Sequence, residues 1–294
     1  MDADQVRRVR SFNRTVSQRI GALNDHFLDR ARPLGEARLL CEIGSAGAEV
    51  RRLRAQLELD SGYVSRLLRS LERQGLVRAR AAADDGRVRR LTLTRKGLRE
   101  VAEYDRRAGA LASSILEPLS AAQRDRMIAA MAEVERLMRA SAVQIKAEAA
   151  GSTDAQWCIA QYFSENARRF DTGFDPGRTI SANPGELTPP AGIFVIARLG
   201  GQAIGCGGLK VKDRRIGEIK RMWVAPDARG LGLGRRVLET LERHAREFGL
   251  RRLRLETNRA LTEAQALYRR CGYREVEPFN DEPFAHHWFE KVRI

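Results

Sequence analysis

The stretch from Glu218 to Glu242 decides the fold of this chain: Glu-Ile-Lys-Arg-Met-Trp-Val-Ala-Pro-Asp-Ala-Arg-Gly-Leu-Gly-Leu-Gly-Arg-Arg-Val-Leu-Glu-Thr-Leu-Glu. It begins with a short run of strand-forming residues, which Pro226 ends because proline has no N–H for a sheet ladder. From Val237 onward, apolar residues recur every three or four positions, which predicts an amphipathic helix. Gly249 suits the left-handed residue that closes such a helix. The stretch therefore predicts a strand, a tight turn and a helix.

The turn, Arg229-Gly-Leu-Gly-Leu-Gly234, is rich in glycine. Backbone N–H groups can converge there because few Cβ atoms stand in the way, and the helix start adds unpaired N–H groups and a partial positive charge. This arrangement predicts a cradle for a pyrophosphate, to which Arg229 and Arg235 could add charge-assisted hydrogen bonds. A simple turn is the alternative. A dinucleotide-binding fold would place such a loop after the first strand of a domain, whereas here it follows a predicted hairpin.

Length and composition indicate a cytoplasmic protein of two domains. A chain of 294 residues suggests two domains. It has no run of 18 apolar residues and no apolar segment behind a basic N-terminus, so we expect neither a membrane span nor a signal peptide. The four cysteines lie far apart in the sequence, which fits a reduced cytosol and core packing and predicts no metal site.

Positive charge is concentrated in one part of the chain. The formal net charge is +15, and residues 51–99 carry 14 lysines and arginines against 5 acidic residues. A basic cluster on a folded segment indicates contact with nucleic acid, and we expect association with the nucleoid when DNA is bound. A solvated basic face is the alternative.

The first half of the chain predicts mainly helices. Apolar residues at helical spacing predict helices over 4–31, 35–43 and 48–57. A further helix lies between Asp60, suited to an N-cap, and Gly75, suited to a C-terminal stop. Two strand-like runs follow, 76–80 and 88–93, and then two long helices.

The helix between Asp60 and Gly75 has an outer face suited to the DNA major groove. The residues on this face are Ser61, Gly62, Tyr63, Ser65, Arg66 and Arg69. The hairpin after it carries arginines that could contact phosphates or enter the minor groove. These are Arg78, Arg80, Arg87 and Arg89.

The order of these elements resembles regulators of the multiple-antibiotic-resistance (MarR) family. The motifs that carry the resemblance are Gly75-Leu-Val-Arg78, Asp85-Gly-Arg87 and Leu91-Thr-Leu-Thr-x-x-Gly97. The resemblance covers about residues 4–141. It implies a mainly α winged helix-turn-helix that binds double-stranded DNA as a homodimer built by its first and last helices. A winged helix kept only for dimerisation or protein contact is the alternative.

The second half alternates strands and helices. The apolar pattern predicts a strand over 143–148, a helix from Asp154 to Phe170, and strands over 193–199 and 202–211. The strand and helix of the stretch from Glu218 to Glu242 come next. After them the pattern predicts a strand over 252–257, a helix from Thr262, and strands near Val276 and over 287–292. We therefore expect one domain over residues 1–142 and a second over 143–294.

Two motifs in the second half resemble GNAT-type N-acetyltransferases over about residues 143–294. They are Arg-x-x-Gly-x-Gly after a Val-x-Pro strand end, and Glu263-Ala-Gln-Ala-Leu-Tyr-Arg-Arg-Cys-Gly-Tyr273. The resemblance implies an α+β fold with a mixed, splayed sheet, and acetyl-CoA inserted where the strands separate. The cofactor contacts that it implies are Met222, Trp223, Val224, Arg229, Gly230, Leu231, Gly232, Leu233, Gly234, Arg235 and Asn258.

The resemblance also implies a mechanism of direct acetyl transfer. Tyr268 matches the tyrosine that protonates the departing CoA thiolate, and a strand N–H near Met222 would stabilise the oxyanion. A packed helix tyrosine is the alternative for Tyr268. Glu218 is our candidate general base, with Glu256 as its competitor and a salt bridge to Lys220 or Arg221 as its alternative role.

The sequence therefore predicts a regulator fused to an acetyltransferase that modifies the amine of a small molecule. Two alternatives stay open: a domain that only senses acetyl-CoA, and a protein lysine acetyltransferase. The tail over residues 279–288, with adjacent histidines at 286 and 287, is expected to border the acceptor pocket, without a metal. The acceptor, the operator, the direction of regulation, the coupling of the domains and the identity of the base are not specified by the sequence.

Overall fold

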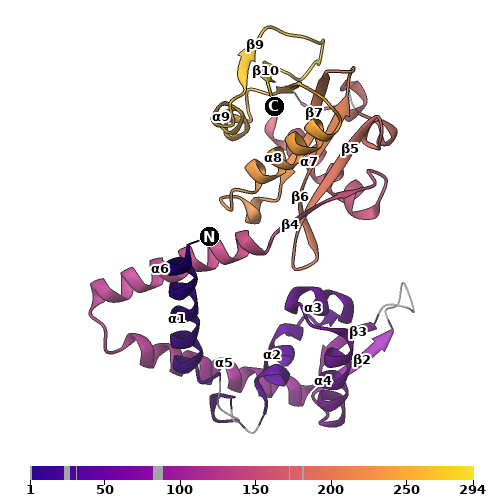
Figure 1. Cartoon of the computed structure of the whole chain (residues 1–294). Coiled ribbons are helices and arrows are strands. Elements are labelled where there is room, and N and C mark those ends of the chain that lie inside the picture. Colours follow the sequence, from indigo (N-terminus) through magenta and orange to yellow (C-terminus); the bar gives the residue numbers. More distant parts are fainter. Residues whose placement is uncertain (1, 23–26, 31, 82–88, 172, 181) are drawn as a thin grey trace. The chain divides into compact units, whose positions relative to one another are not determined.

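The chain forms two compact units, Met1–Ala132 and Glu133–Ile294, in a computed structural model (Figure 1). The structure describes residues 2–22, 27–30, 32–81, 89–171, 173–180 and 182–294. The division falls inside helix α6 (Ala121–Ala142).

The last turn of α6 is attached to the second unit by Arg236. The guanidinium of Arg236 donates to the carbonyl of Ala140 and, at 2.7 Å, to that of Val143. These bonds explain why contacts divide the chain inside α6, before the sequence-based boundary. That boundary, after residue 142, stays a prediction.

The first unit is mainly helical with a small antiparallel sheet in the order β1-β3-β2. Its elements are α1 (Ala3–Arg19), η1 (Phe27–Asp29), α2 (Leu34–Ile43), β1 (Ala48–Glu49), α3 (Val50–Leu57), α4 (Ser61–Arg73), β2 (Val77–Ala81), β3 (Arg89–Leu93), α5 (Arg95–Leu116) and the start of α6. Its core is aliphatic and includes Leu39, Leu40, Ile43, Leu53, Val64, Leu71, Leu76 and Leu91.

Local capping sets the ends of the central helices in this unit. The Asp60 side chain accepts the Tyr63 N–H at 2.9 Å at the start of α4, and the Thr94 hydroxyl accepts the Gly97 N–H at 3.1 Å at the start of α5. Gly97 also allows close packing, because a Cβ there would lie 2.2 Å from the Leu76 carbonyl oxygen. These bonds fix where α4 begins and where α5 follows the paired strands β2 and β3.

Two predictions about the first unit were wrong in their bounds. The first helix ends at Arg19, not at residue 31, because Gly21 adopts φ 65° in the turn that follows. The third helix begins at Val50, since Ala48 and Glu49 pair with β3. The wing tip, residues 82–88 with Arg87, lies outside the described residues.

The second unit contains a mixed seven-stranded sheet in the order β4-β5-β6-β7-β8-β10-β9. Its strands are β4 (Gln144–Glu148), β5 (Gly192–Leu199), β6 (Gln202–Val211), β7 (Ile216–Val224), β8 (Arg252–Thr257), β9 (Arg274–Val276) and β10 (His287–Val292). Its helices are α7 (Thr153–Arg169), α8 (Leu233–Glu247), α9 (Thr262–Arg270) and the short η2 (Pro176–Arg178), η3 (Pro184–Leu187) and η4 (Pro226–Ala228).

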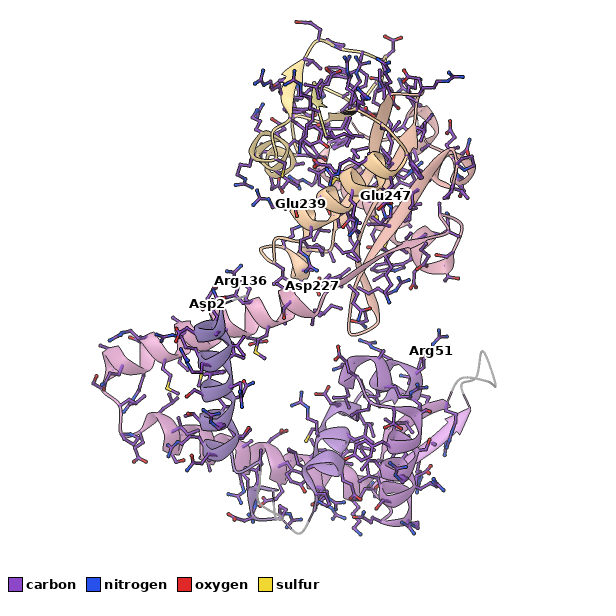
Figure 2. The ribbon with its side chains drawn as sticks, viewed as in Figure 1. Asp2, Arg51, Arg136, Asp227, Glu239 and Glu247 are labelled. Atoms are coloured by element: carbon purple, nitrogen blue, oxygen red, sulfur yellow. The ribbon has the colours of Figure 1, made fainter. Side chains whose placement is uncertain are left out.

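Helices α7 and α8 cover opposite faces of the central strands. A Cβ on Gly207 of β6 would meet Val237 and Leu241 of α8, at 2.9 Å each. Its neighbour Cys206 instead meets Cys158 of α7. Since successive strand residues point to opposite faces, the sheet is packed between the two helices. The exposed side of α8 carries Glu239 and Glu247 (Figure 2).

One prediction about the start of α7 was wrong. Ser152, not Asp154, caps the helix, because its hydroxyl accepts the Ala155 N–H at 3.2 Å. Asp154 instead forms an ion pair with Arg198 of β5 at 2.6 Å. The other predicted elements of this unit are present within a few residues of their expected bounds.

Candidate functional site

The site begins where β7 and β8 separate. These parallel strands pair only over three positions, of which Glu218–Arg254 is the last. Beyond this pair β7 continues to Val224 and β8 to Thr257 without pairing to each other. The predicted splay of the sheet is therefore present, and it opens next to the glycine-rich turn.

A bulge in β7 shapes the same region. The pairing of β6 with β7 shifts between Cys206 and Gly208, so that Gly207 faces both Arg221 and Met222. Arg221 adopts φ 53°, a left-handed conformation that costs a non-glycine residue about 1–2 kcal/mol. Such strain persists where the surrounding structure fixes it, and it is common at functional sites.

The glycine-rich turn has the geometry of an anion cradle. Gly230 and Gly232 adopt φ 79° and 70°, conformations that favour glycine. Helix α8 starts at Leu233, and no side chain caps its first N–H groups. Those groups are consequently available to an anion at the positive end of the helix dipole.

A cavity of about 610 Å³ lies against this turn. Predicted cofactor residues that line it are Met222, Trp223, Val224, Arg229, Gly230, Gly232, Leu233, Gly234 and Arg235. The Leu231 side chain is in the core instead, 9% exposed. Asn258 lines a second, smaller cavity, where its amide donates to the Phe284 carbonyl at 2.7 Å.

Arg229 is held by a carboxylate that the sequence analysis did not single out. Both oxygens of Glu165 on α7 accept from its Nη2, at 2.7 and 2.6 Å. Glu165 also accepts from the Trp223 indole at 3.0 Å. Burial would raise the pKa of Glu165, but its bonds to Arg229 and Arg169 outweigh burial and lower it. The carboxylate thus fixes Arg229 at the edge of the large cavity.

The second cavity, of about 100 Å³, shares a wall with the first. The residues that line both are Tyr162, Asn166, Met222, Leu261, Ala264 and Tyr268. A reacting group in one cavity would therefore be separated from a ligand in the other cavity by these side chains and the bulged strand. This pair of adjacent cavities suits the transfer of a group between two ligands.

Tyr268 lies on the shared wall, as its predicted role requires. It is 6% exposed and packs against Tyr273 and Phe289, with ring centroids 6.1 and 5.9 Å away. Burial, with smaller contributions from Tyr162 and Glu256, raises the pKa of Tyr268 well above its ordinary value. The hydroxyl therefore keeps its proton at neutral pH and can act as a proton donor.

The carboxylates near β7 surround one lysine. Lys220 is 7% exposed, bonded to Glu256, with Glu218 at 3.5 Å. Burial would lower the pKa of Lys220, but the attraction of Glu256, Glu218 and Glu282 outweighs it and raises the pKa. Glu256 and Lys220 line the small cavity, whereas Glu218 does not.

Sequence reasoning missed the residues of the small cavity that come from α7 and the loop after it. Asn166 is 3% exposed, and its Nδ2 has no hydrogen-bond partner among the described residues, although the amide lies near the Tyr162 hydroxyl. Phe163, Phe170 and Phe174 also line the cavity. The apolar spacing of Phe163 on α7 is indistinguishable from core packing, and Phe170 and Phe174 follow the end of that helix. For Phe174 the sequence offered a signal in the polar, Gly- and Pro-rich composition of residues 172–191, which is typical of a loop over a site.

The first unit contains a candidate nucleic-acid interface on α4 and the hairpin. Most predicted contact residues there are exposed: Ser61, Gly62, Ser65, Arg66, Arg69, Arg78, Arg80 and Arg89. Tyr63 is half-buried, and the Arg66 guanidinium lies 5.7 Å from its ring centroid. Arg89 is 3.9 Å from Glu72, and Arg87 lies outside the described residues. These cations extend over the helix and both strands.

Helices α1 and α6 expose apolar side chains. No residue of either helix is buried within the described chain. Along α1 the exposed fractions are 60% for Val9 and 48% for Phe12, and along α6 they are 51% for Ile128 and 49% for Met131. Amphipathic helices rarely leave such stripes in water, so these faces suit a protein interface.

Within the described ranges, no helix is long and apolar enough to cross a membrane, and no group of three His, Cys, Asp or Glu side chains could hold a metal.

Comparison with known proteins identifies both units. The Acetyltransferase (GNAT) family matches residues 156–273, and the MarR family matches residues 31–88. An uncharacterized N-acetyltransferase of Schizosaccharomyces pombe is 33% identical over 137 residues, which are 44% of this chain and 80% of that protein. The chain belongs to the GNAT acetyltransferase family. Its N-terminal unit carries a MarR-family region, so the protein is a MarR–GNAT fusion.

Other GNAT relatives match the same part of the chain. An IAA acetyltransferase of Azospirillum brasilense is 43% identical over 94 residues, which are 32% of this chain but only 61% of that protein. A crystal structure of a GNAT-family acetyltransferase from Staphylococcus aureus has a TM-score of 0.46 at 18% identity, covering 52% of this chain and all of that one.

Proposed function

We propose that this GNAT protein transfers acetyl from acetyl-CoA directly to the amine of a small molecule, while its MarR unit binds operator DNA. The observation that carries the first part is the pair of cavities that share Tyr268, Met222 and Asn166. The larger one runs along the glycine-rich turn and the uncapped start of α8, which fit the pyrophosphate of acetyl-CoA. The smaller one would hold the amine.

The protein would accelerate this reaction mainly by positioning its two substrates. An unprotonated amine forms a bond to the thioester carbonyl carbon, the carbon–sulfur bond breaks, and the thiolate leaves. The Met222 N–H at the bulge and the Asn166 Nδ2 would donate to the carbonyl oxygen as it gains negative charge. Tyr268 would give its proton to the thiolate, which completes release of CoA.

The proton lost by the amine would go to a carboxylate of the cluster around Lys220. Glu218, the first candidate, is 5% exposed but does not line the small cavity, whereas Glu256 does. We therefore propose Glu256 as the proton acceptor and Glu218 as the residue that positions Lys220. Asn280 supports Glu256 through its amide at 3.5 Å and accepts from the Trp288 indole at 2.8 Å.

For the MarR unit, we propose that α4 enters the major groove and the hairpin contacts the backbone. The family match and the exposed cations on α4, β2 and β3 support this assignment. We further propose a homodimer through the apolar stripes of α1 and α6, because neither helix buries a residue within the described chain. Paired recognition helices would then read two half-sites.

An acceptor panel tests the proposed activity. The full chain is mixed with acetyl-CoA and single primary amines, and release of free thiol is measured against a no-amine control. The account predicts amine-dependent release for at least one small molecule, and Glu256→Gln lowers it more than Glu218→Gln. If acetyl-CoA binds but no small amine supports release, the domain is a sensor; acetylated lysines on copurified proteins would favour a protein acetyltransferase.

A further inference from the structure

Resting on the proposed acetyl transfer, we infer that the acceptor is a primary amine that bears an aromatic ring and no carboxylate. Glu282 would hold its ammonium group, and four phenylalanines would hold its ring. The inference concerns the small cavity alone. Three features of its lining lead to it: a cluster of rings, a carboxylate without an ion pair among the described residues, and two cations that are already engaged.

The apolar wall of the cavity is a cluster of phenylalanine rings. Phe174 lies at its centre, with ring centroids 5.7 Å from Phe163, 5.4 Å from Phe170 and 5.0 Å from Phe284. All four rings line the cavity. These separations are those of favourable edge-to-face and offset contacts, and an aromatic ligand can join such a cluster in the same geometries. A purely polar acceptor would gain no such contact from this wall.

Glu282 places a carboxylate beside this wall. Its two oxygens accept backbone N–H groups, from Ile180 at 2.8 Å and from Phe284 at 3.5 Å. These bonds fix the carboxylate at the cavity, and no lysine, arginine or histidine among the described residues forms an ion pair with it. Burial, and repulsion by Glu256, raise the pKa of Glu282. A ligand ammonium would supply the charge that a half-buried carboxylate favours, and the amine that attacks forms once this ammonium has released one proton to water.

The cations that line the cavity are already engaged, which selects against a carboxylate on the ligand. Of the lining residues, two carboxylates, Glu256 and Glu282, stand against two cations, Lys220 and Arg221. Lys220 is engaged by Glu256 and Glu218, and Arg221 stacks 4.6 Å from the Phe163 centroid and donates to the Ala182 carbonyl. Glu282 is therefore the charge that a ligand can still pair: a monovalent ammonium pairs it, whereas the carboxylate of a zwitterion would meet two cations that are already engaged. Arg178, near Phe284, is exposed and screened by water.

The ring cluster also assists ammonium binding directly. A cation near the face of an aromatic ring is attracted by the electrons of the ring, and the attraction strengthens when water is excluded. Phe284 lies two residues after Glu282 and lines the same cavity. Glu282 and Phe284, which come from one segment of chain, would thus contact the ammonium and the ring of the same ligand.

The test compares three amines on the full chain with acetyl-CoA, with free thiol release as the readout. The probes are 2-phenylethylamine, phenylalanine and ethanolamine. The inference predicts that kcat/KM for 2-phenylethylamine exceeds that for each of the other two by at least about tenfold. If phenylalanine or ethanolamine reacts as well as 2-phenylethylamine, the inference is overturned while the acetyl transfer stands. If none of the three releases thiol and no other amine does, the proposed activity fails, and the inference fails with it.

Two variants test the assigned residues, with one matched control. Glu282→Gln should raise KM for 2-phenylethylamine about tenfold or more, and Phe174→Leu should reduce the preference for that amine over ethanolamine, both with an unchanged KM for acetyl-CoA. Asp281→Asn removes an exposed neighbouring carboxylate and should change neither value. An unchanged KM for the amine in Glu282→Gln would contradict the assignment, whether or not Phe174→Leu folds.

Discussion

At the scale of single residues, Tyr268 is the side chain whose environment most clearly matches a task. It is buried on the wall shared by both cavities, and burial raises its pKa. We predict that Tyr268→Phe lowers kcat about 10²–10⁴-fold, because general acid catalysis typically contributes that much. Acetyl-CoA affinity, measured by calorimetry, should stay within a factor of a few. Loss of binding together with activity would instead indicate a packing role.

The pH dependence of the wild-type enzyme follows from the same residue. Because the pKa of Tyr268 is raised, the hydroxyl remains protonated up to high pH, so activity should not fall between about pH 7 and pH 11 through loss of its proton, whereas a tyrosine of ordinary pKa would lose it there. A kcat profile over this range checks the point. A decline with an apparent pKa near the ordinary value of tyrosine, absent in Tyr268→Phe, would contradict the assignment.

Substitution of Asn166 distinguishes a role in catalysis from a role in stability. Its Nδ2 is buried without a hydrogen-bond partner among the described residues. We predict that Asn166→Leu, which keeps the volume but removes the donor, lowers kcat about 10²–10³-fold, as loss of an oxyanion donor does. Thermal stability should be equal or higher, since a buried amide is removed. A variant that is less stable and fully active would show that the amide is structural.

At the scale of elements, the glycine-rich turn and α8 form the part of the site that the sequence specified best. Pro226, the three glycines and the apolar spacing of α8 are local signals, and the structure places strand, turn and helix where they were expected. The first predicted helix, over residues 4–31, was too long, because apolar spacing continues past Gly21 whereas the backbone turns there. Local signals fix elements well and their ends less well.

Apart from the tail over residues 279–288, which was expected to border it, the acceptor cavity could not be predicted, because its residues meet only after folding. Phe163 and Asn166 come from α7, Glu256 from β8, and Glu282 from the tail. Nothing in their spacing brings them together, since the crossing of β7 and β8 and the position of α7 decide it. The choice between Glu218 and Glu256 illustrates the point: both flank Lys220, but only Glu256 lines the cavity.

The turn itself yields a direct prediction. Gly232→Ala should weaken acetyl-CoA binding, because alanine at φ 70° costs about 1–2 kcal/mol and its relaxation would move the first N–H groups of α8. This corresponds to about a 5- to 30-fold rise in Kd by calorimetry if the cost falls on binding. Gly151→Ala, at an exposed glycine with open space around it, is the control and should bind normally. Equal affinities in both variants would show that the turn does not hold the ligand.

Helix α4 and the hairpin should contribute differently to DNA binding. Arg66→Ala should cost about 1–3 kcal/mol on the operator and relax its specificity, as loss of a base contact does. Arg87→Ala, in the sequence between β2 and β3, should weaken binding to all sequences and reduce the salt slope by about one. Fluorescence anisotropy on operator and random duplexes measures both. The same loss on both duplexes for Arg66→Ala would refute the recognition-helix assignment.

At the scale of the whole molecule, the exposed stripes of α1 and α6 predict self-association. Phe12→Glu places a charge in the α1 stripe, where Phe12 is 48% exposed, and should shift the full chain from dimer to monomer. Arg14→Glu, an exposed change of similar size on the same helix, is the control and should remain dimeric. Sedimentation velocity resolves the two species. A wild-type chain that stays monomeric at micromolar concentrations would contradict the proposed dimer.

The central claim is that the turn at residues 229–234 and the start of α8 hold acetyl-CoA in the large cavity. Calorimetric titration of the full chain with acetyl-CoA tests it most directly. The account predicts one site per chain, with a Kd in the range of about 1 µM to 1 mM that is typical of enzyme substrates. A titration that shows no saturable heat at any temperature tested, with the chain folded, would contradict it.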